Sequence, residues 1–144
     1  MKRSSLFAFS VTLALASGAC LSAAQAQAVD IGKYEFETYC AVCHGKDAKG
    51  GGPFSMLMTK KVPDLSVLAK SNNGVFPFAR TYEIIDGTSE LAGHGTREMP
   101  VWGDHYLQKV PGQLGPLYTP TDSASFVRGR IMALVGYLST LQQK

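Results

Sequence analysis

The feature that most constrains this chain is the pentapeptide Cys40-Ala41-Val42-Cys43-His44. Two thiols three positions apart, followed at once by an imidazole, form the signature of covalent haem attachment. On a helix, residues three and four positions apart share a face, so Cys40, Cys43 and His44 can all point at one flat ligand. The motif therefore predicts one haem c, held by two thioethers and one axial imidazole, with the rest of the chain folded around it.

Three other uses of these residues have weaker support. A structural zinc site needs four ligands, and the only other cysteine is Cys20. A thioredoxin-type pair lies at the start of a helix, whereas here an amphipathic segment precedes the motif and places it near a helix end. A plain disulfide between Cys40 and Cys43 leaves His44 without a role. Covalent haem attachment is the interpretation that uses all three side chains.

The chain opens with the pattern of an exported protein. Lys2 and Arg3 precede an apolar run over residues 6–16, and small residues lead to an A-x-A site that ends at Ala28. This order is typical of a secretory signal peptide, and the run is shorter than the about twenty residues that a membrane span needs. We expect cleavage after Ala28 and export to the periplasm. An uncleaved anchor and lipidation at Cys20 are the alternatives.

Cleavage would divide the chain into a signal peptide, 1–28, and one domain, 29–144. Removal of Lys2 and Arg3 from the 14 basic side chains leaves 12, against 11 acidic ones. So small an excess of positive charge does not point to nucleic acid as a partner. The length fits a single domain whose modest core a buried haem would enlarge, and we expect a monomer with no membrane span after cleavage.

Two segments have helical periodicity. Apolar and aromatic residues recur over 30–43, with Asp30 as the predicted N-cap. The stretch 123–142 is the clearer helix. Its apolar stripe consists of Val127, Ile131, Leu134, Val135, Leu138 and Leu141. Gly129 and Gly136 weaken this helix by about 1 kcal/mol each relative to alanine, which calls for a reason such as the close approach of another backbone.

Four further features support a family resemblance. They are Gly32 and Phe36 before the motif, the segments 63–65 (Pro-Asp-Leu) and 99–102 (Met-Pro-Val-Trp), and the segment 134–138 (Leu-Val-Gly-Tyr-Leu). With the attachment motif, they make the chain resemble the class I c-type cytochromes. The resemblance implies an all-α fold in which the N- and C-terminal helices cross and helices and loops wrap around one haem. It also implies an electron-transfer protein rather than an enzyme.

The resemblance implies roles for individual residues. The carbonyl of Pro63 would accept a hydrogen bond from Nδ1 of His44, and Met99 would be the second axial ligand. Pro53 is the rival acceptor, although its glycine-rich surroundings favour a role in shaping the turn. Trp102 would pack against the haem with its indole N–H toward a propionate, and the alternative is a core aromatic without haem contact.

The residues themselves also favour Met99 as the sixth ligand. It follows a polar, glycine-containing stretch over 87–98, and Pro100 stiffens the chain just beyond it. Met132 lies in the C-terminal helical segment and is expected to fill the core. The remaining candidates are Met56, Met58, His94 and His105, and an open site. The two histidines are by default surface or hydrogen-bonded side chains.

Charge is unevenly placed after the motif. Between residues 44 and 70 the chain carries five lysines, Lys46, Lys49, Lys60, Lys61 and Lys70. They predict a basic docking face at the haem edge that steers an acidic redox partner, or, alternatively, a scattered solvated surface. Arg80 and Arg97, both expected on loops, either face the propionates or lie in solvent.

A thioether opposite an imidazole fills both axial positions, so such an iron passes electrons and offers no site to a substrate. We therefore expect a periplasmic carrier that cycles between Fe(III) and Fe(II). One alternative is a subunit of a larger dehydrogenase, sulfur-oxidising or oxidase complex; another is a haem enzyme or sensor with an open iron site. The Pro- and Gly-rich connection 103–122, longer than in the smallest members of the family, predicts few regular helices there.

Overall fold

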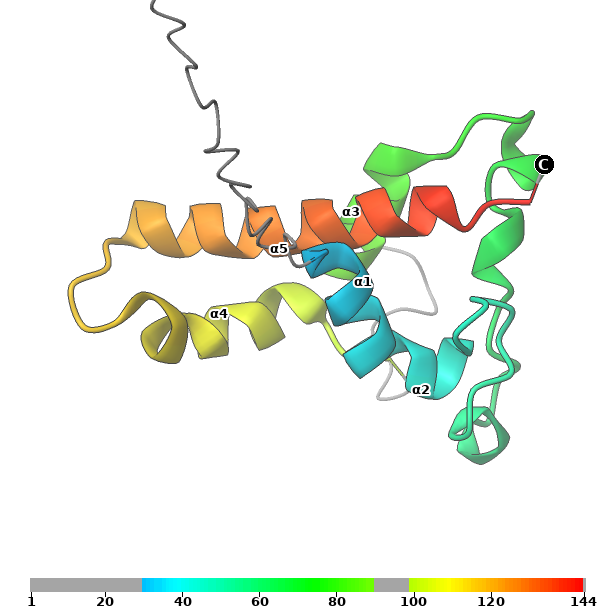
Figure 1. The fold of residues 1–144 in the computed structure, drawn as a ribbon, viewed down its shortest axis with the longest axis horizontal. Coiled ribbons are helices and arrows are strands. Elements are labelled where there is room, and N and C mark those ends of the chain that lie inside the picture. Colours follow the sequence, from blue (N-terminus) through cyan, green and yellow to red (C-terminus); the bar gives the residue numbers. More distant parts are fainter. Residues whose placement is uncertain (1–29, 90–98, 144) are drawn as a thin grey trace, which may run out of the picture.

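The computed structural model describes residues 30–89 and 99–143 (Figure 1). Over these residues the chain is all-helical and contains no strand, as the all-α prediction requires. The helices are α1 (Ile31–Glu35), α2 (Ala41–His44), α3 (Phe78–Asp86), α4 (Trp102–Leu114) and α5 (Pro120–Thr140). Single turns of 3₁₀ helix occur at Ser55–Leu57, Leu65–Val67 and Lys70–Asn72. The predicted signal peptide with Cys20, and also His94 and Arg97, lie outside the described residues.

The segment before the motif forms the predicted helix, with one irregularity. Asp30 is its N-cap, and its side chain accepts a hydrogen bond from the Lys33 amide at 2.9 Å. A π-helical turn, Phe36–Cys40, joins α1 to α2, because the Ala41 amide bonds the carbonyl of Phe36 five residues back. The helix ends at Gly45, whose φ of 75° suits glycine. The motif therefore lies at a helix end, as predicted.

Helix α5 begins three residues before the predicted start. Thr119 and Asp122 form a reciprocal capping box, and Pro120 occupies the first turn, so the cap starts the helix ahead of its apolar stripe. Four members of the predicted stripe are buried, namely Ile131, Leu134, Val135 and Leu138. Met132 is 48% exposed, and its prediction as core filler is wrong, because it follows Ile131 directly and turns away from the buried face.

The helices at the two ends of the described chain cross (Figure 1). A side chain at Gly32 on α1 would collide with the backbone oxygen of Ala133 on α5, so the two backbones touch there. The predicted reason for Gly129 and Gly136 is wrong: a Cβ added at either would meet no atom within 4 Å. The close approach that the helix crossing needs is provided by the glycine on α1.

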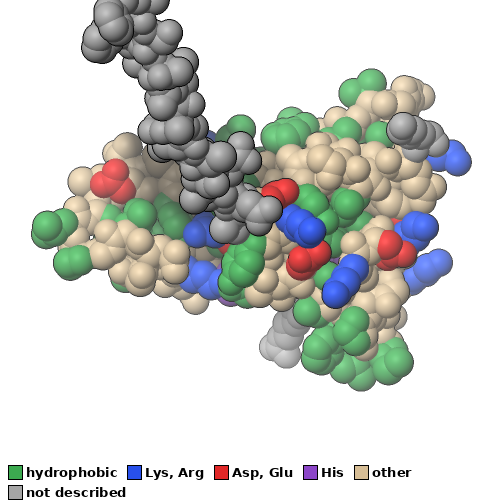
Figure 2. Space-filling view, viewed as in Figure 1, with side chains coloured by type: hydrophobic (Ala, Val, Ile, Leu, Met, Phe, Trp, Pro, Cys, Tyr) green, Lys and Arg blue, Asp and Glu red, His purple; other side chains and the backbone are tan. Residues whose placement is uncertain are grey.

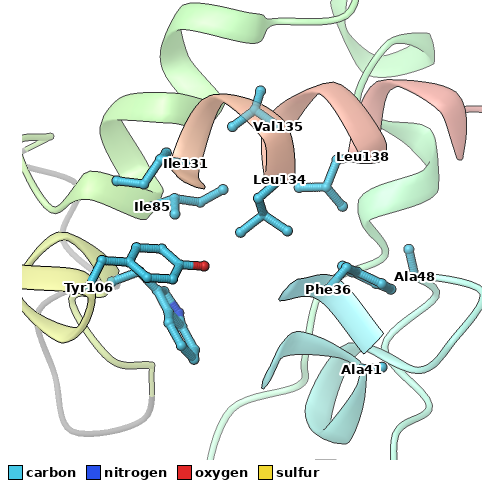
Figure 3. Packing of buried hydrophobic residues seen from close by; sticks show 10 residues of the cluster. Phe36, Ala41, Ala48, Ile85, Tyr106, Ile131, Leu134, Val135 and Leu138 are labelled. Atoms are coloured by element: carbon cyan, nitrogen blue, oxygen red, sulfur yellow. The ribbon is translucent and has the colours of Figure 1, made fainter. Parts of the chain in front are cut away.

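The prediction of few regular helices after residue 103 is also wrong. Helix α4 continues through Pro111, which sacrifices one backbone hydrogen bond near the C-terminal end. Trp102, Tyr106 and Val110 recur every four residues and are buried, so packing outweighs that loss. Helix α4 packs against α5 and α3, and the buried side chains of all these elements meet in one core (Figure 3).

A buried ion pair joins α1 to α5. Glu35 is only 3% exposed, and its Oε1 accepts a hydrogen bond from Nη1 of Arg130 at 2.5 Å. Neither residue stood out in the sequence, because a lone glutamate and arginine carry no pattern.

No helix within the described residues is both long and apolar enough to span a membrane.

Candidate functional site

The side chains of Cys40, Cys43 and His44 line one cavity of about 520 Å³. Pro63, Met99 and Trp102 line the same cavity, so every residue predicted for the site is brought to it. Apolar side chains from α3, α5 and the loops complete the lining, among them Phe36, Leu65, Leu68, Ile84, Ile85, Leu134 and Leu138. A large apolar hollow with a few convergent polar groups suits a flat, mostly apolar ligand.

The two thiols are free and partly buried at the cavity wall. Burial raises the pKa of Cys40 to about 12, and the nearby charges of Glu35 and Cys43 raise it further. Cys40 is therefore a neutral thiol at neutral pH. It closes the π-helical turn, and such turns often occur at functional sites. The sequence contains no signal that would have predicted this turn.

His44 is held from two directions. Its side chain is 8% exposed, and Nδ1 lies 3.3 Å from the carbonyl oxygen of Pro63, the contact that the resemblance implies. Its own carbonyl accepts a hydrogen bond from the Gly50 amide at 2.7 Å. Pro53, the rival acceptor, is exposed in the glycine-rich turn and does not line the cavity. With Nδ1–H donated to a carbonyl, Nε2 keeps the lone pair that a metal would use.

Of the methionine candidates for a second ligand, Met99 and Met58 line the cavity. Met99 also packs against the hydrophobic core. Met56 is 84% exposed, and neither it nor Met132 reaches the cavity. The described structure therefore reduces the methionine candidates to two.

His105 does not line the cavity, and its expected environment is wrong. Its ring is half-buried in an aromatic cluster, with its centroid 4.8 Å from that of Trp102. Its Nε2 is buried and has no hydrogen-bond partner among the described residues. Burial and the nearby Lys109 charge lower the pKa of this imidazole, so it is neutral at neutral pH.

Trp102 belongs to the cavity wall and to the core at once. It is buried, lines the cavity and lies with its ring centroid 5.6 Å from that of Tyr39. The burial of Trp102 and its packing in the core agree with the predicted core aromatic, whereas its contact with a haem and the direction of its indole N–H stay predictions. Its position at the first turn of α4 places it between the cavity and the core.

The donors at the cavity suit a metal that arrives inside a prosthetic group. No cluster of three or more His, Cys, Asp or Glu side chains able to hold a bare metal ion occurs in the described parts of the chain. The cavity offers two thiols, one oriented imidazole and thioether sulfurs in an apolar lining. This set fits a haem, which supplies four of its own nitrogen ligands and needs only axial donors and attachment points.

Comparison of the chain with protein-family models, with curated proteins and with solved structures finds no match.

Proposed function

We propose that this protein is a periplasmic c-type cytochrome that binds one haem covalently in the cavity and carries electrons between redox partners. One observation carries the proposal: the six predicted residues, which come from three separate segments (40–44, 63 and 99–102), line a single cavity. The all-helical fold with its crossing of α1 and α5 is what a class I cytochrome c requires.

In this proposal each site residue has one task. Cys40 and Cys43 would hold the haem through thioethers, and Nε2 of His44 and the sulfur of Met99 would bind its iron. When bound, the haem supplies one-electron chemistry between Fe(III) and Fe(II). The Pro63 carbonyl orients the imidazole and raises its basicity. A neutral thioether and an apolar lining favour the reduced, less charged state, which gives the site a higher potential than two imidazoles would.

The surface beside the cavity supports a protein partner. The five predicted lysines are all exposed, and Lys60 and Lys61 also line the cavity, as does Arg80, which lies on α3 rather than on the expected loop. Figure 2 shows one face of the molecule, on which Lys and Arg side chains lie intermixed with Asp and Glu side chains. A basic rim at the cavity attracts an acidic redox protein and brings it close to the group that exchanges electrons. Electron transfer to such a partner should slow as ionic strength rises, and a rate insensitive to salt would argue against this docking face.

The deciding experiment is an absorption spectrum of the exported, purified protein in both redox states, repeated for three methionine variants. The wild type should show a low-spin c-type haem with the weak ferric thioether charge-transfer band. Met99→Ala should lose that band and bind carbon monoxide when reduced. Met56→Ala, which changes an exposed side chain outside the cavity, is the matched control. It should keep the low-spin spectrum and the charge-transfer band of the wild type.

Other outcomes point elsewhere. If Met58→Ala rather than Met99→Ala loses the band, the sixth ligand is Met58. A wild-type protein that lacks the band and already binds carbon monoxide would be an open-site enzyme or sensor. A protein exported without haem would overturn the proposal.

A further inference from the structure

The residues that follow α5 pack against the segment that follows Pro63. Gln142 lies two residues past the end of α5, and its side-chain oxygen accepts a hydrogen bond from the Ala69 amide at 2.9 Å. Its side-chain nitrogen donates to the carbonyls of Leu65 and Leu138, each at 2.9 Å. Both N–H donors and the oxygen of this side-chain amide are therefore engaged, which fixes its orientation.

The Gln142 side chain takes the place of a backbone hydrogen bond. The Ala69 amide and the Leu65 carbonyl are four residues apart, the spacing at which they would bond each other in an α-helix. Here the amide group of Gln142 bridges them, accepting from the first and donating to the second. Gln143 adds a bond from its own backbone amide to the Ser66 carbonyl at 2.8 Å. The end of α5 thus binds the backbone of segment 65–69.

The same segment is tied to the turn that holds the imidazole. The Leu65 amide donates to the carbonyl of Ala48 at 2.7 Å, while the Leu65 carbonyl accepts from Gln142. Two residues earlier, the carbonyl oxygen of Pro63 lies 3.3 Å from Nδ1 of His44. This distance is long for a hydrogen bond to nitrogen, so a displacement of a few tenths of an ångström changes the strength of the contact. The position of Leu65 therefore controls how well Pro63 binds His44.

We infer that Gln142 is a positioning residue for the axial imidazole, because it holds the turn at Leu65 and thereby sets the Pro63 carbonyl against His44. The inference rests on the proposed function and adds a residue that neither the motif nor the resemblance indicates. The hydrogen bond to Pro63 makes the imidazole more basic and so favours Fe(III). Gln142 therefore lowers the reduction potential of the haem-loaded protein.

The first test measures hydrogen exchange by NMR in the reduced, haem-loaded protein. Gln142→Leu keeps a side chain of similar size but removes the three hydrogen bonds. Exchange should become about tenfold faster at the Ala69 amide and at Nδ1–H of His44, as the loss of several hydrogen bonds predicts. Ile131→Val is the matched control, since it removes one buried methylene group from α5 outside the cavity. It should change exchange at these two sites no more than elsewhere in the protein.

The second test measures the midpoint potential of the same variants. Gln142→Leu should raise the potential and retain the ferric thioether charge-transfer band, because the imidazole becomes a weaker donor while Met99 is unchanged. Ile131→Val should leave the potential close to that of the wild type. If Gln142→Leu speeds exchange at Ala69 but leaves Nδ1–H and the potential unchanged, Gln142 only stabilises the turn and the inference is overturned.

A second variant covers the case in which Gln142→Leu does not fold. Gln142→Asn retains the amide group on a shorter side chain and should shift both readouts in the same direction; unchanged values would overturn the inference. A wild-type protein exported without haem overturns the proposed function and this role together. A haem-loaded protein whose potential and Nδ1–H exchange ignore residue 142 overturns only the positioning role.

Discussion

The cavity has two walls that carry the proposed axial ligands, and these walls are built differently. The His44 wall consists of α2 and the turn that follows it, residues 41–54, and the Met99 wall consists of residues 99–102. On the His44 wall, backbone hydrogen bonds tie the turn after the motif to the end of the helix: Gly52 N to Cys43 O at 3.0 Å and Phe54 N to Val42 O at 2.8 Å. Burial of Gly52 leaves no room for a Cβ, since it would lie 2.5 Å from two backbone oxygens of α2. The conformation of this wall is therefore fixed by backbone hydrogen bonds and by close backbone contact.

The Met99 wall depends on packing instead. Gly87 at the end of α3 touches the side chain of Val101 just before α4. The end of α3 and the start of α4 therefore lie close together, on either side of the segment that carries Met99. No hydrogen bond of the described residues involves Met99, which is held by contacts with the core. The difference teaches that hydrogen bonds to and from the backbone hold the imidazole, whereas packing against apolar side chains holds the thioether.

The largest expected effect comes from the buried ion pair that joins α1 to α5. Arg130→Met should lower the free energy of unfolding by about 3 kcal/mol, because it leaves the Glu35 carboxylate buried and unpaired. The value is at the low end for a buried pair because the Arg130 side chain is 23% exposed. Urea denaturation measures it. The double variant Glu35→Gln/Arg130→Met should recover most of the lost stability. If it recovers none, the loss does not come from the unpaired Glu35 carboxylate.

Gly52→Ala tests the His44 wall directly. The added methyl group must displace backbone of α2, and overpacking of this kind costs about 2 kcal/mol. Gly51→Ala is the control at the neighbouring position, where a Cβ would meet nothing within 4 Å. Thermal unfolding of both variants measures the difference. Equal stability would show that this turn yields easily and that the two walls do not differ as described.

Met99→Leu tests the opposite wall. Leucine keeps the apolar volume, so the free energy of unfolding measured in denaturant without haem should fall by under about 1.5 kcal/mol. The same change removes the thioether, so the ferric charge-transfer band should disappear from the haem-loaded protein. A larger loss of stability than that of Gly52→Ala would reverse the order of the two walls.

The smallest expected effect is on acid stability. The hydrogen bond from the Ser66 hydroxyl is the main cause that lowers the pKa of Asp64 below its ordinary value of 3.8. A lowered folded-state pKa stabilises the protein above pH 3.8, and that contribution is lost as the pH falls toward the lowered pKa. Asp64→Asn should therefore lose less stability than the wild type between pH 4 and pH 2. Parallel acid titrations followed by circular dichroism would detect this, and identical curves would exclude Asp64 as a contributor.

The sequence predicted those parts of the fold that local rules control. Asp30 as an N-cap and the apolar stripe of α5 follow from capping and periodicity, and both predictions are confirmed. Helix α4 was missed because Pro111 and its glycines hide a four-residue spacing that only tertiary packing rewards. The role of Met132 was misjudged because a helical position alone does not tell which face it occupies.

The candidate site also has features that the sequence predicted and features that it did not. The motif and the resemblance named six residues, and the structure brings them to one cavity, whereas their roles toward a haem stay predictions. The π-helical turn before Cys40 and the absence of carboxylates around the described cavity were not predictable. The first is a change in backbone bonding with no composition of its own. The second depends on which distant segments meet at the cavity mouth.

The crossing of α1 and α5 has a consequence for how the protein is made. Gly32 is among the first residues of the described chain to be synthesised, and Ala133, which it touches, is among the last. Contacts between such distant segments form slowly, because the chain between them must first be ordered. The core therefore cannot close until synthesis is nearly finished. Because Leu134 and Leu138 of α5 line the cavity, the cavity is also incomplete until then.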